Sequence, residues 1–563
     1  MMLNGSEILL ETLLEQGVDT VFGYPGGAVL NIYDALYNYS DRINHILASH
    51  EQHACHAADG YARTTGKTGV VIATSGPGAS NLVTGLATAN MDSIPIVAIT
   101  GNVTTSLLGL DSFQEINITG VTKPITKKNW QVTDVTKLAD VVREAFFVAN
   151  EGRKGPVLID ITKNVTADLC EFEREPVRDI PTVTEKDSTL LEKAAELIAA
   201  SERPLIITGG GTALSCAEKE LSRLAELTDA PVCSTLMGIN TFDNTDPAFL
   251  GMLGMHGTKA ASQALVNADL IIALGTRFSD RVTCSAKSFE KNIENARIIH
   301  IDVDTKEFDK NVKADLHIHS DVRAALTAIN DALSPVQRRE WKERCIKLCS
   351  EYPLYQTSED KEAVLPQYVL ETLAELTNRE AIITTEVGQH QMWTAQFFPF
   401  KVPHSFATSG GLGTMGYGFG AAIGAKAGNP DRTVVNIAGD GSFYMNIGEL
   451  STLSKYRMPV IELVFNNSVL GMVRQWQRLF YDKHFSQTTL EKPTDFEALA
   501  KAFGVAYVCI TKKSEVREKL EYALNCGEPV LINCVIDKDV NVLPMVPAGK
   551  SVAAPLMELN IDD

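Results

Sequence analysis

The chain has no run of apolar residues near the roughly 20 needed to cross a bilayer, so we expect no membrane span. Its start, Met-Met-Leu-Asn-Gly-Ser, lacks the basic and apolar regions of a signal peptide and the Arg- and Ser-rich character of a transit segment. Positive charge is also scarce: 51 Lys and Arg residues face 70 Asp and Glu residues, which gives a formal net charge of -19. Because phosphates would be repelled, we expect no nucleic-acid partner.

The ten cysteines are scattered over the 563 residues, and no two have CxxC spacing. This pattern is typical of mostly buried free thiols in a reducing compartment, so a cytoplasmic location is the expectation. No GxGxxG motif opens a helix after a strand, which argues against a nicotinamide dehydrogenase. The remaining composition, 45% hydrophobic and 21% charged, is that of an ordinary soluble protein.

Two polar stretches with prolines, residues 171–187 and 334–363, divide the chain into three parts. Each part repeats one pattern, in which a short apolar strand leads into a glycine-rich loop and a helical stretch follows. Such alternation predicts an α/β fold of three domains with mainly parallel sheets flanked by helices. We place the domains at residues 1–175, 188–335 and 364–545. Ligands of such sheets bind at the carboxyl ends of the strands, so the glycine-rich loops are the candidate sites.

The most specific motif lies between Gly439 and Asn467. Gly439-Asp440-Gly441 follows one apolar strand, and Asn466-Asn467 follows the next one. Because adjacent parallel strands end at the same edge of a sheet, we expect the oxygens of Asp440 and Asn467 to lie close together. Mg²⁺ prefers hard oxygen ligands and usually takes one or two side chains plus phosphate. A lone GDG is usually a turn, but with the paired asparagines it predicts a magnesium–diphosphate site.

At this motif the chain resembles the acetohydroxyacid synthases, which use thiamin diphosphate. The resemblance rests on residues 439–443, 466–467 and 471–477, and it extends over nearly the whole chain. It implies that the main-chain oxygen of Val469 is a third magnesium ligand. The remaining residues that it implies for binding the diphosphate or the aminopyrimidine of the cofactor are Val387, Gly388, Gln389, His390, Gly413, Met415, Gly439, Gly441 and Ser442.

Thiamin chemistry also requires one carboxylate that hydrogen-bonds the pyrimidine ring and so activates the cofactor. Taken alone, Glu51 would be a carboxylate at a helix start, favoured by the helix dipole. The family has His-Glu-Gln before Ala-Ala-Asp-Gly-Tyr-Ala-Arg, and both segments are present here at residues 50–52 and 57–63. The resemblance therefore implies that Glu51 is the activating acid. His53 departs from the family pattern, and we expect it on the helix surface.

The same resemblance assigns residues to the rest of the active site. It implies that Gly27 lies over the thiazolium ring and that Arg281 binds the carboxylate of the second substrate. A guanidinium group suits the second role, because its fork of N–H donors matches a carboxylate. The resemblance implies that further residues line the pyrimidine side of the cofactor, the substrate channel or the substrate pocket. These are Thr74, Pro77, Asn81, Phe113, Gln114, Lys163, Met472 and Trp476.

The middle part of the chain resembles the FAD-binding segments of the family at residues 251–257 and 275–282. Ser279 stands where the family usually has Asp. Because the reaction has no net redox step, this flavin would be structural. The implied flavin contacts are Arg153, Gly209, Gly210, Gly254, Met255, His256, Gly275, Arg277, Asp302 and Asp321.

The implied activity is a transferase reaction on small 2-keto acids. Pyruvate is decarboxylated, and the hydroxyethyl carbanion condenses with pyruvate or 2-oxobutyrate, giving 2-acetolactate or 2-aceto-2-hydroxybutyrate in branched-chain amino acid biosynthesis. The resemblance also implies a homodimer or higher homo-oligomer, with the cofactor between two subunits, and a separate small regulatory subunit.

Two alternatives stay open at this point. One is a catabolic acetolactate synthase without flavin, against which Trp476 and the 277–281 segment argue. The other is a non-catalytic nucleotide-binding protein on the same scaffold, against which the intact Glu51, Asp440 and Asn467 argue.

Overall fold

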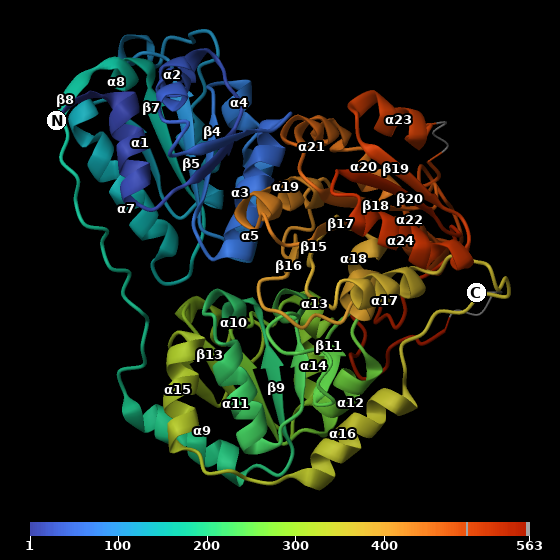
Figure 1. The fold of residues 1–563 in the computed structure, drawn as a ribbon. Helices are drawn as coiled ribbons and strands as arrows, with labels where there is room; N and C mark the ends of the chain where they lie inside the picture. The colour runs from blue at the N-terminus through green and yellow to red at the C-terminus, as the bar shows by residue number, and fades with distance from the viewer. Residues whose placement is uncertain (491–493, 559–563) are drawn as a thin grey trace.

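The computed structural model describes residues 1–490 and 494–558, and within them the chain forms three six-stranded parallel sheets (Figure 1). The first sheet has the order β3 (Asn44–Leu47), β2 (Thr20–Gly23), β4 (Gly69–Ala73), β5 (Ile96–Asn102), β7 (Val157–Thr162) and β6 (Asn129–Val132). A short antiparallel pair, β1 (Met2–Asn4) with β8 (Leu169–Glu171), lies beside it. The predicted α/β fold with parallel sheets is therefore confirmed.

The second sheet has the order β11 (Phe249–Met252), β10 (Val232–Ser234), β9 (Pro204–Thr208), β12 (Leu270–Leu274), β13 (Arg297–Asp302) and β14 (Leu316–His319). The third has the order β16 (Phe406–Thr408), β15 (Ile382–Thr385), β17 (Val434–Gly439), β18 (Val460–Asn466), β20 (Val530–Val535) and β19 (Ala506–Ile510). Central strands such as β4 and β12 are buried at every residue, because helices cover both faces of each sheet.

The first and third sheets are joined by two helices packed against each other, α3 (Glu51–Thr65) and α19 (Gly418–Gly428) (Figure 1). Their backbones touch at glycines. A Cβ atom on Gly424 would lie 1.8 Å from the carbonyl oxygen of Ala57, and one on Gly60 would lie 2.2 Å from that of Ala421. A side chain at either position would push the helices apart, so small residues fix this contact between the two domains.

Of the two segments that connect the three sheets, the second is more structured than the sequence suggests. Residues 172–187 are irregular as expected, and α9 (Ser188–Ala200) follows with Asp187 as its N-cap. Within the stretch 334–363, however, α16 (Arg339–Glu351) forms and packs on α12 (Lys259–Asn267) of the middle domain. The reason is apolar burial, because Trp341 and Cys345 on this helix enter the middle core. The third domain then begins with α17 (Pro366–Leu376).

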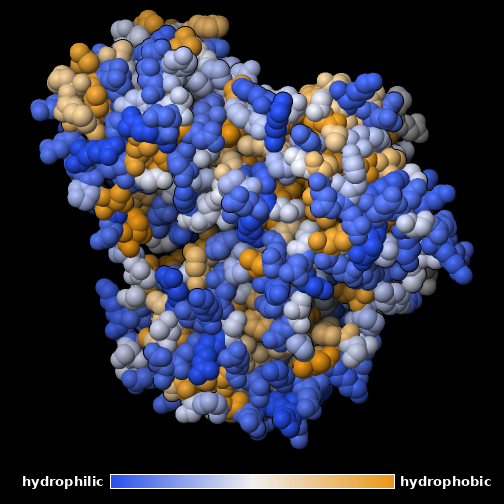
Figure 2. Space-filling view, viewed as in Figure 1, coloured by the Kyte–Doolittle hydropathy of each residue, from blue (hydrophilic) through white to orange (hydrophobic). Residues whose placement is uncertain are grey.

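The end of the described chain returns to the middle domain, where Val546 and Val552 join the same core. Among the described residues, no helix is both long enough and apolar enough to cross a membrane. The face in Figure 2 accordingly mixes polar and apolar residues, with the apolar ones in scattered groups.

Candidate functional site

The predicted pyrimidine-side residues gather at the carboxyl edge of the first sheet. Glu51 is the first residue of α3 and is buried, and the Asn81 amide donates to its Oε2 at 2.9 Å. Thr74 follows β4, and a Cβ atom on Gly26 would lie 2.5 Å from the Thr74 Cβ. The backbone around Gly27 therefore passes directly over this cluster.

The other predicted residues of this domain surround the same edge. Pro77 begins α4 (Pro77–Ser80), and Gly76 approaches Gln114 so closely that a Cβ would lie 2.9 Å from its Cα. Lys163 begins α8 (Lys163–Ala167) directly after β7. Phe113 is 88% exposed in the single chain, which is a large apolar surface left open next to the cluster.

The turn before Glu51 is held by Glu449 of the third domain, which the sequence reading missed. The backbone N–H and the hydroxyl of Ser49 donate to this carboxylate, and His53 Nδ1 lies 2.9 Å from its Oε1. Burial alone would raise the pKa of Glu449, but hydrogen bonds from His53, Ser49 and Thr452 lower it below its usual range. The expectation that His53 lies on the helix surface is wrong, because α3 turns this side chain toward the third domain, where it is buried.

The predicted diphosphate-side residues gather in the third domain, at the ends of β15, β17 and β18. Asp440 is buried, follows β17 and begins the short α20 (Asp440–Phe443). Gly439 pairs with Phe465 across the two parallel strands, so Asp440 and Asn467 leave the sheet at the same edge. The Ser442 hydroxyl donates to the Gly439 carbonyl at 3.1 Å, and Val469 lies buried just beyond Asn467.

Residues 387–390 close around this edge. The ring of His390, near the start of α18 (Gln389–Phe397), packs on Gly439, where a Cβ atom would lie 2.8 Å from its Nδ1. Burial lowers the pKa of His390 to about 3, so the ring is neutral, and its buried Nε2 has no hydrogen-bond partner. A Cβ on Gly471 would lie 1.9 Å from Gln389 Oε1, another buried atom without a partner. The Cβ-free backbone at Gly439 and Gly471 leaves this edge open to a diphosphate group, whereas the unpaired Gln389 oxygen is an acceptor that needs a donor or a cation.

Within the described residues there is no group of three or more His, Cys, Asp or Glu side chains that could hold a metal ion. A metal at this edge would therefore depend on one carboxylate, one amide and main-chain oxygen. That is the hard, weakly charged ligand set that Mg²⁺ takes when phosphate completes its coordination.

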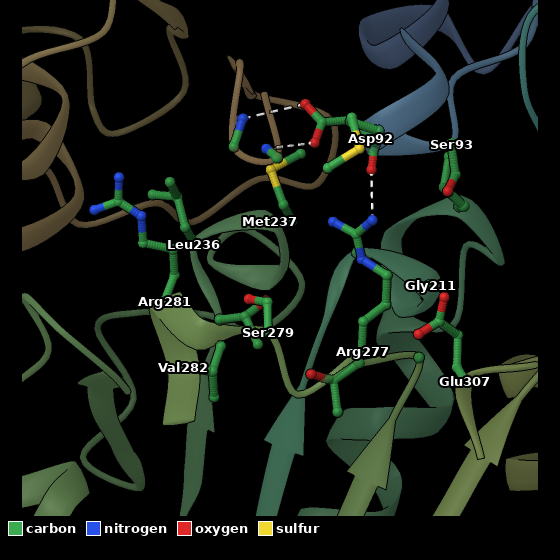
Figure 3. A pocket seen from close by; sticks show the side chains of 18 of the residues that line it. Asp92, Ser93, Gly211, Leu236, Met237, Arg277, Ser279, Arg281, Val282 and Glu307 are labelled. Atoms are coloured by element: carbon green, nitrogen blue, oxygen red, sulfur yellow. Dashed lines mark hydrogen bonds between the residues drawn. The ribbon is translucent and has the colours of Figure 1, made fainter. Parts of the chain in front are cut away.

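A cavity of about 410 Å³ lies where the three domains meet (Figure 3). Arg277 projects from the middle domain and donates to the main-chain oxygen of Met91 at 2.7 Å. The Asp92 carboxylate accepts from the backbone N–H groups of Gly410 and Gly411. The cavity thus has walls from all three parts of the chain.

Thirteen of the predicted residues line this cavity. They are Arg153, Gly210, Met255, His256, Gly275, Arg277, Arg281, Asp302, Asp321, Val387, Gly388, Gly413 and Met472. Gly209 and Gly254 do not line it but support its walls, since a Cβ on each would lie 2.3 Å from the Gly275 carbonyl oxygen and 2.1 Å from the Arg281 carbonyl oxygen. The described residues that line the cavity include neither Glu51 nor Asp440, so one chain does not bring its two cofactor-binding edges into this space.

The cavity's size and lining fit an extended ligand such as a dinucleotide. The helix starts at Gly210 and at the N-cap Asp321 present backbone, while Asp302 stands at the end of β13. Burial raises the pKa of Asp302 to about 6. Burial and the nearby Arg281 lower the pKa of His256 to about 3, which leaves its ring neutral. Ser279, the departure from the family pattern, also lines the cavity.

Trp476 lies on α22 (Gly471–Phe480), one turn after Met472 and on the same side. Its indole packs against the Phe480 ring, with centroids 5.1 Å apart, and against the core of the middle domain. Met472 lines the cavity, and Trp476 does not.

Several lining residues were missed by the sequence reading, among them Asp92, Ser93, Lys154 and Glu307. Asp92 is the clearest case, because it ends the helix α5 (Val83–Asp92) and would be read as a surface residue. Only the folded chain shows that Arg63, 2.9 Å away, and two backbone N–H groups of the third domain converge on it.

Comparison with known protein families places this architecture in one class. Residues 3–121 match the N-terminal TPP binding domain of thiamine pyrophosphate enzymes, residues 191–329 match their central domain, and residues 386–534 match their C-terminal TPP binding domain. The domain composition is that of a thiamine pyrophosphate enzyme; thiamine pyrophosphate is thiamin diphosphate by another name.

Relatives narrow the class. The chain is 46% identical to a probable acetolactate synthase large subunit of Methanocaldococcus jannaschii, over 97% of this chain and 94% of that protein. It is 42% identical to the acetolactate synthase isozyme 2 large subunit of Escherichia coli, over 99% and 100%. It is 43% identical to the chloroplastic acetolactate synthase 2 of Nicotiana tabacum, over 97% and 84%. The chain belongs to the family of acetolactate synthase large subunits.

Proposed function

We propose that this chain catalyses the formation of acetohydroxy acids, joining pyruvate to a second 2-keto acid with loss of carbon dioxide. The observation that carries the proposal is the similarity to acetolactate synthase large subunits along nearly the whole chain. The assay is the release of 2-acetolactate from pyruvate by purified protein supplied with thiamin diphosphate, Mg²⁺ and FAD. Carbon dioxide without acetolactate would mean a simple decarboxylase and would overturn it.

We assign the proton chemistry to Glu51. Thiamin diphosphate, when bound, would supply a carbon nucleophile and a sink for the electron pair left by carbon dioxide. Glu51 would hold a proton at the pyrimidine ring, and burial at the start of α3 keeps water from competing for it. Asn81 fixes one carboxylate oxygen, and Glu449 fixes the turn that precedes the acid.

We assign magnesium to Asp440, Asn467 and the main-chain oxygen of Val469, and the diphosphate to the loops around His390 and Ser442. We also propose the domain limits 1–175, 188–335 and 364–545, which follow from the two polar stretches that divide the sequence. Gln114, Lys163, Phe113 and Arg281 would orient the two keto acids.

We propose that a second copy of the chain completes each active site. Two features support this. Glu51 and Asp440 leave the edges of two different sheets, and large apolar side chains near the two edges are exposed in the single chain. They include Leu110, Phe113, Leu412 and Met445, and a homodimer would cover them. The M. jannaschii and E. coli relatives are named large subunits, which supports a separate small regulatory partner.

FAD is the ligand that we propose for the cavity between the three domains.

The purified protein should carry or take up FAD, and turnover should need the flavin's shape and not its redox chemistry. The analogue 5-deaza-FAD, with its altered redox behaviour, should therefore restore activity to protein stripped of flavin. Visible absorbance and fluorescence titration measure the binding. A stripped protein that is fully active and binds no added FAD would contradict the assignment and favour a flavin-independent acetolactate synthase.

Trp476→Leu should lower the preference for 2-oxobutyrate over pyruvate as acceptor by about tenfold or more, while acetolactate formation from pyruvate alone persists. A well-shaped apolar wall can use one methylene for about 1–3 kcal/mol. The indole lies one helical turn from Met472, which lines the cavity together with Arg281. The measurement is the product ratio with both keto acids competing.

Tyr481→Leu is the matched control for this prediction, since it removes an aromatic ring from the C-terminal cap of the same helix at an exposed position. It should leave the ratio unchanged. If Trp476→Leu also leaves the ratio unchanged, the indole serves only to pack the helix on the middle domain.

A further inference from the structure

Cys216 differs in exposure from every other cysteine of the chain. All ten cysteines lie in the described residues and are free thiols, and Cys216 is the one that is exposed. It lies between α10 (Gly210–Leu214) and α11 (Glu218–Thr228) of the middle domain. Burial raises the pKa, and so suppresses the thiolate, of Cys55, Cys233, Cys284, Cys345 and Cys534.

The thiol of Cys216 meets an imidazole from another domain. Its Sγ lies 3.6 Å from Nε2 of His404, which precedes β16 in the third domain. The Nδ1 of His404 lies 3.0 Å from the main-chain oxygen of Arg63 in the first domain. A carbonyl oxygen only accepts, so Nδ1 of the neutral ring carries the proton. Nε2 therefore presents its lone pair to the thiol.

The imidazole is held in place from two domains. With the Asn240 amide oriented so that its oxygen faces residues 404 and 405, this oxygen accepts hydrogen bonds from the backbone N–H groups of His404 and Ser405, each at 3.1 Å. The hydrogen bond with His404 lowers the pKa of the Cys216 thiol, and the same contact raises the pKa of His404. The other charged groups near the pair are Lys154, which favours the thiolate, and Glu218, which opposes it.

The thiamin chemistry does not use this pair, since neither Cys216 nor His404 lines the central cavity. We propose that Cys216 and His404 form a thiol–imidazole pair that undergoes reversible exchange with small disulfides, a modification site at the junction of the three domains. His404 Nε2 takes the thiol proton, and the thiolate attacks one sulfur of the disulfide. A new S–S bond forms on Cys216 as the old one breaks, and the leaving thiolate takes the proton from His404. Cys216 is oxidised, and half of the disulfide is reduced to a thiol.

The position of the site gives the exchange a structural consequence. An adduct on Sγ would separate Cys216 from His404 and break the contact that joins the middle and third domains there. The neighbouring Ser215 lines the central cavity and donates to Asp321 at 2.7 Å. The modification would therefore act on the outer wall of that cavity.

The test is the rate of reaction with 4,4′-dithiodipyridine, followed by release of thiopyridone at pH values between about 5 and 9. We expect one thiol that reacts about tenfold or more faster than the others near neutral pH. Cys216→Ser should abolish the fast phase. His404→Gln should slow it about tenfold and move its pH midpoint up toward that of an ordinary cysteine. Cys526→Ser, which removes a partly buried cysteine of the third domain, should keep it.

Peptide mapping of the wild-type protein after labelling with less than one equivalent of reagent needs no variant, so it decides the matter even if a substitution prevents folding. Label on Cys216, released again by an added thiol, supports the proposal. The proposal is overturned if the label falls elsewhere, if Cys216→Ser keeps the fast phase, or if His404→Gln leaves the midpoint unchanged.

Discussion

Glu51→Gln should give a folded protein that forms acetolactate about 10²–10⁴-fold more slowly, which is the usual loss when one positioned proton donor or acceptor is removed. The substitution keeps the size of the side chain and an oxygen for Asn81, but an amide cannot exchange a proton with the pyrimidine ring. Folding and cofactor binding should survive, because the main contacts of the turn before residue 51 are made by Ser49 and Glu449.

The measurement is the steady-state rate at saturating thiamin diphosphate, with calorimetry to confirm that the cofactor binds. Glu11→Gln is the control, since it removes another buried carboxylate of the same domain, one paired with Arg42 and Arg174 outside the proposed site. Its rate should equal that of the wild type. A Glu51→Gln protein with wild-type turnover would show that another group activates the cofactor.

Asp440→Ala should abolish magnesium-dependent retention of thiamin diphosphate, with a loss of affinity of at least about 100-fold, since even residues behind a metal's direct ligands usually contribute 10–100-fold. Asp440 is the only charged protein ligand proposed, and Mg²⁺ gives up its water reluctantly without a carboxylate. Calorimetric titration with and without a chelator measures the effect. The wild type should lose affinity on chelation, and the variant should be weak in both conditions. Equal affinity for both proteins would refute the metal assignment.

A hybrid of the two variants provides the control for a defect confined to the site. If each active site takes Glu51 from one chain and Asp440 from the other, a dimer of one Glu51→Gln chain and one Asp440→Ala chain holds one intact site. Coexpression should then recover activity that neither variant has alone. No recovery in a confirmed hybrid would place both residues in the same chain's site.

The sequence was sufficient to predict what depends on local pattern. The strands before Thr74, Gly209 and Asp440 are found where the apolar runs lie, because a strand buried on both faces needs a continuous apolar segment. The Gly439 to Asn467 spacing also predicted correctly that two neighbouring strands end together.

What the sequence could not predict depends on contacts between distant segments. The residues near His53 in the sequence do not indicate that Glu449 is its partner. The burial of this pair results from the packing of α3 against the third domain. Asp92 enters the cavity wall only because Gly410 and Gly411 meet it across a domain boundary. The helix α16 was missed because its few apolar residues find their core in another part of the chain.

The contact between α3 and α19 has a consequence for how such a protein can change over evolutionary time. Two helices whose backbones touch at glycines tolerate almost no substitution on the shared face, and neither domain could be exchanged for a foreign one without rebuilding that face. The middle domain is attached differently, through the irregular segment before α9, the helix α16 that enters its core, and the end of the described chain, which joins the same core. The face shared by α3 and α19 should therefore accept the least change, and the two outer domains should have been inherited as a pair.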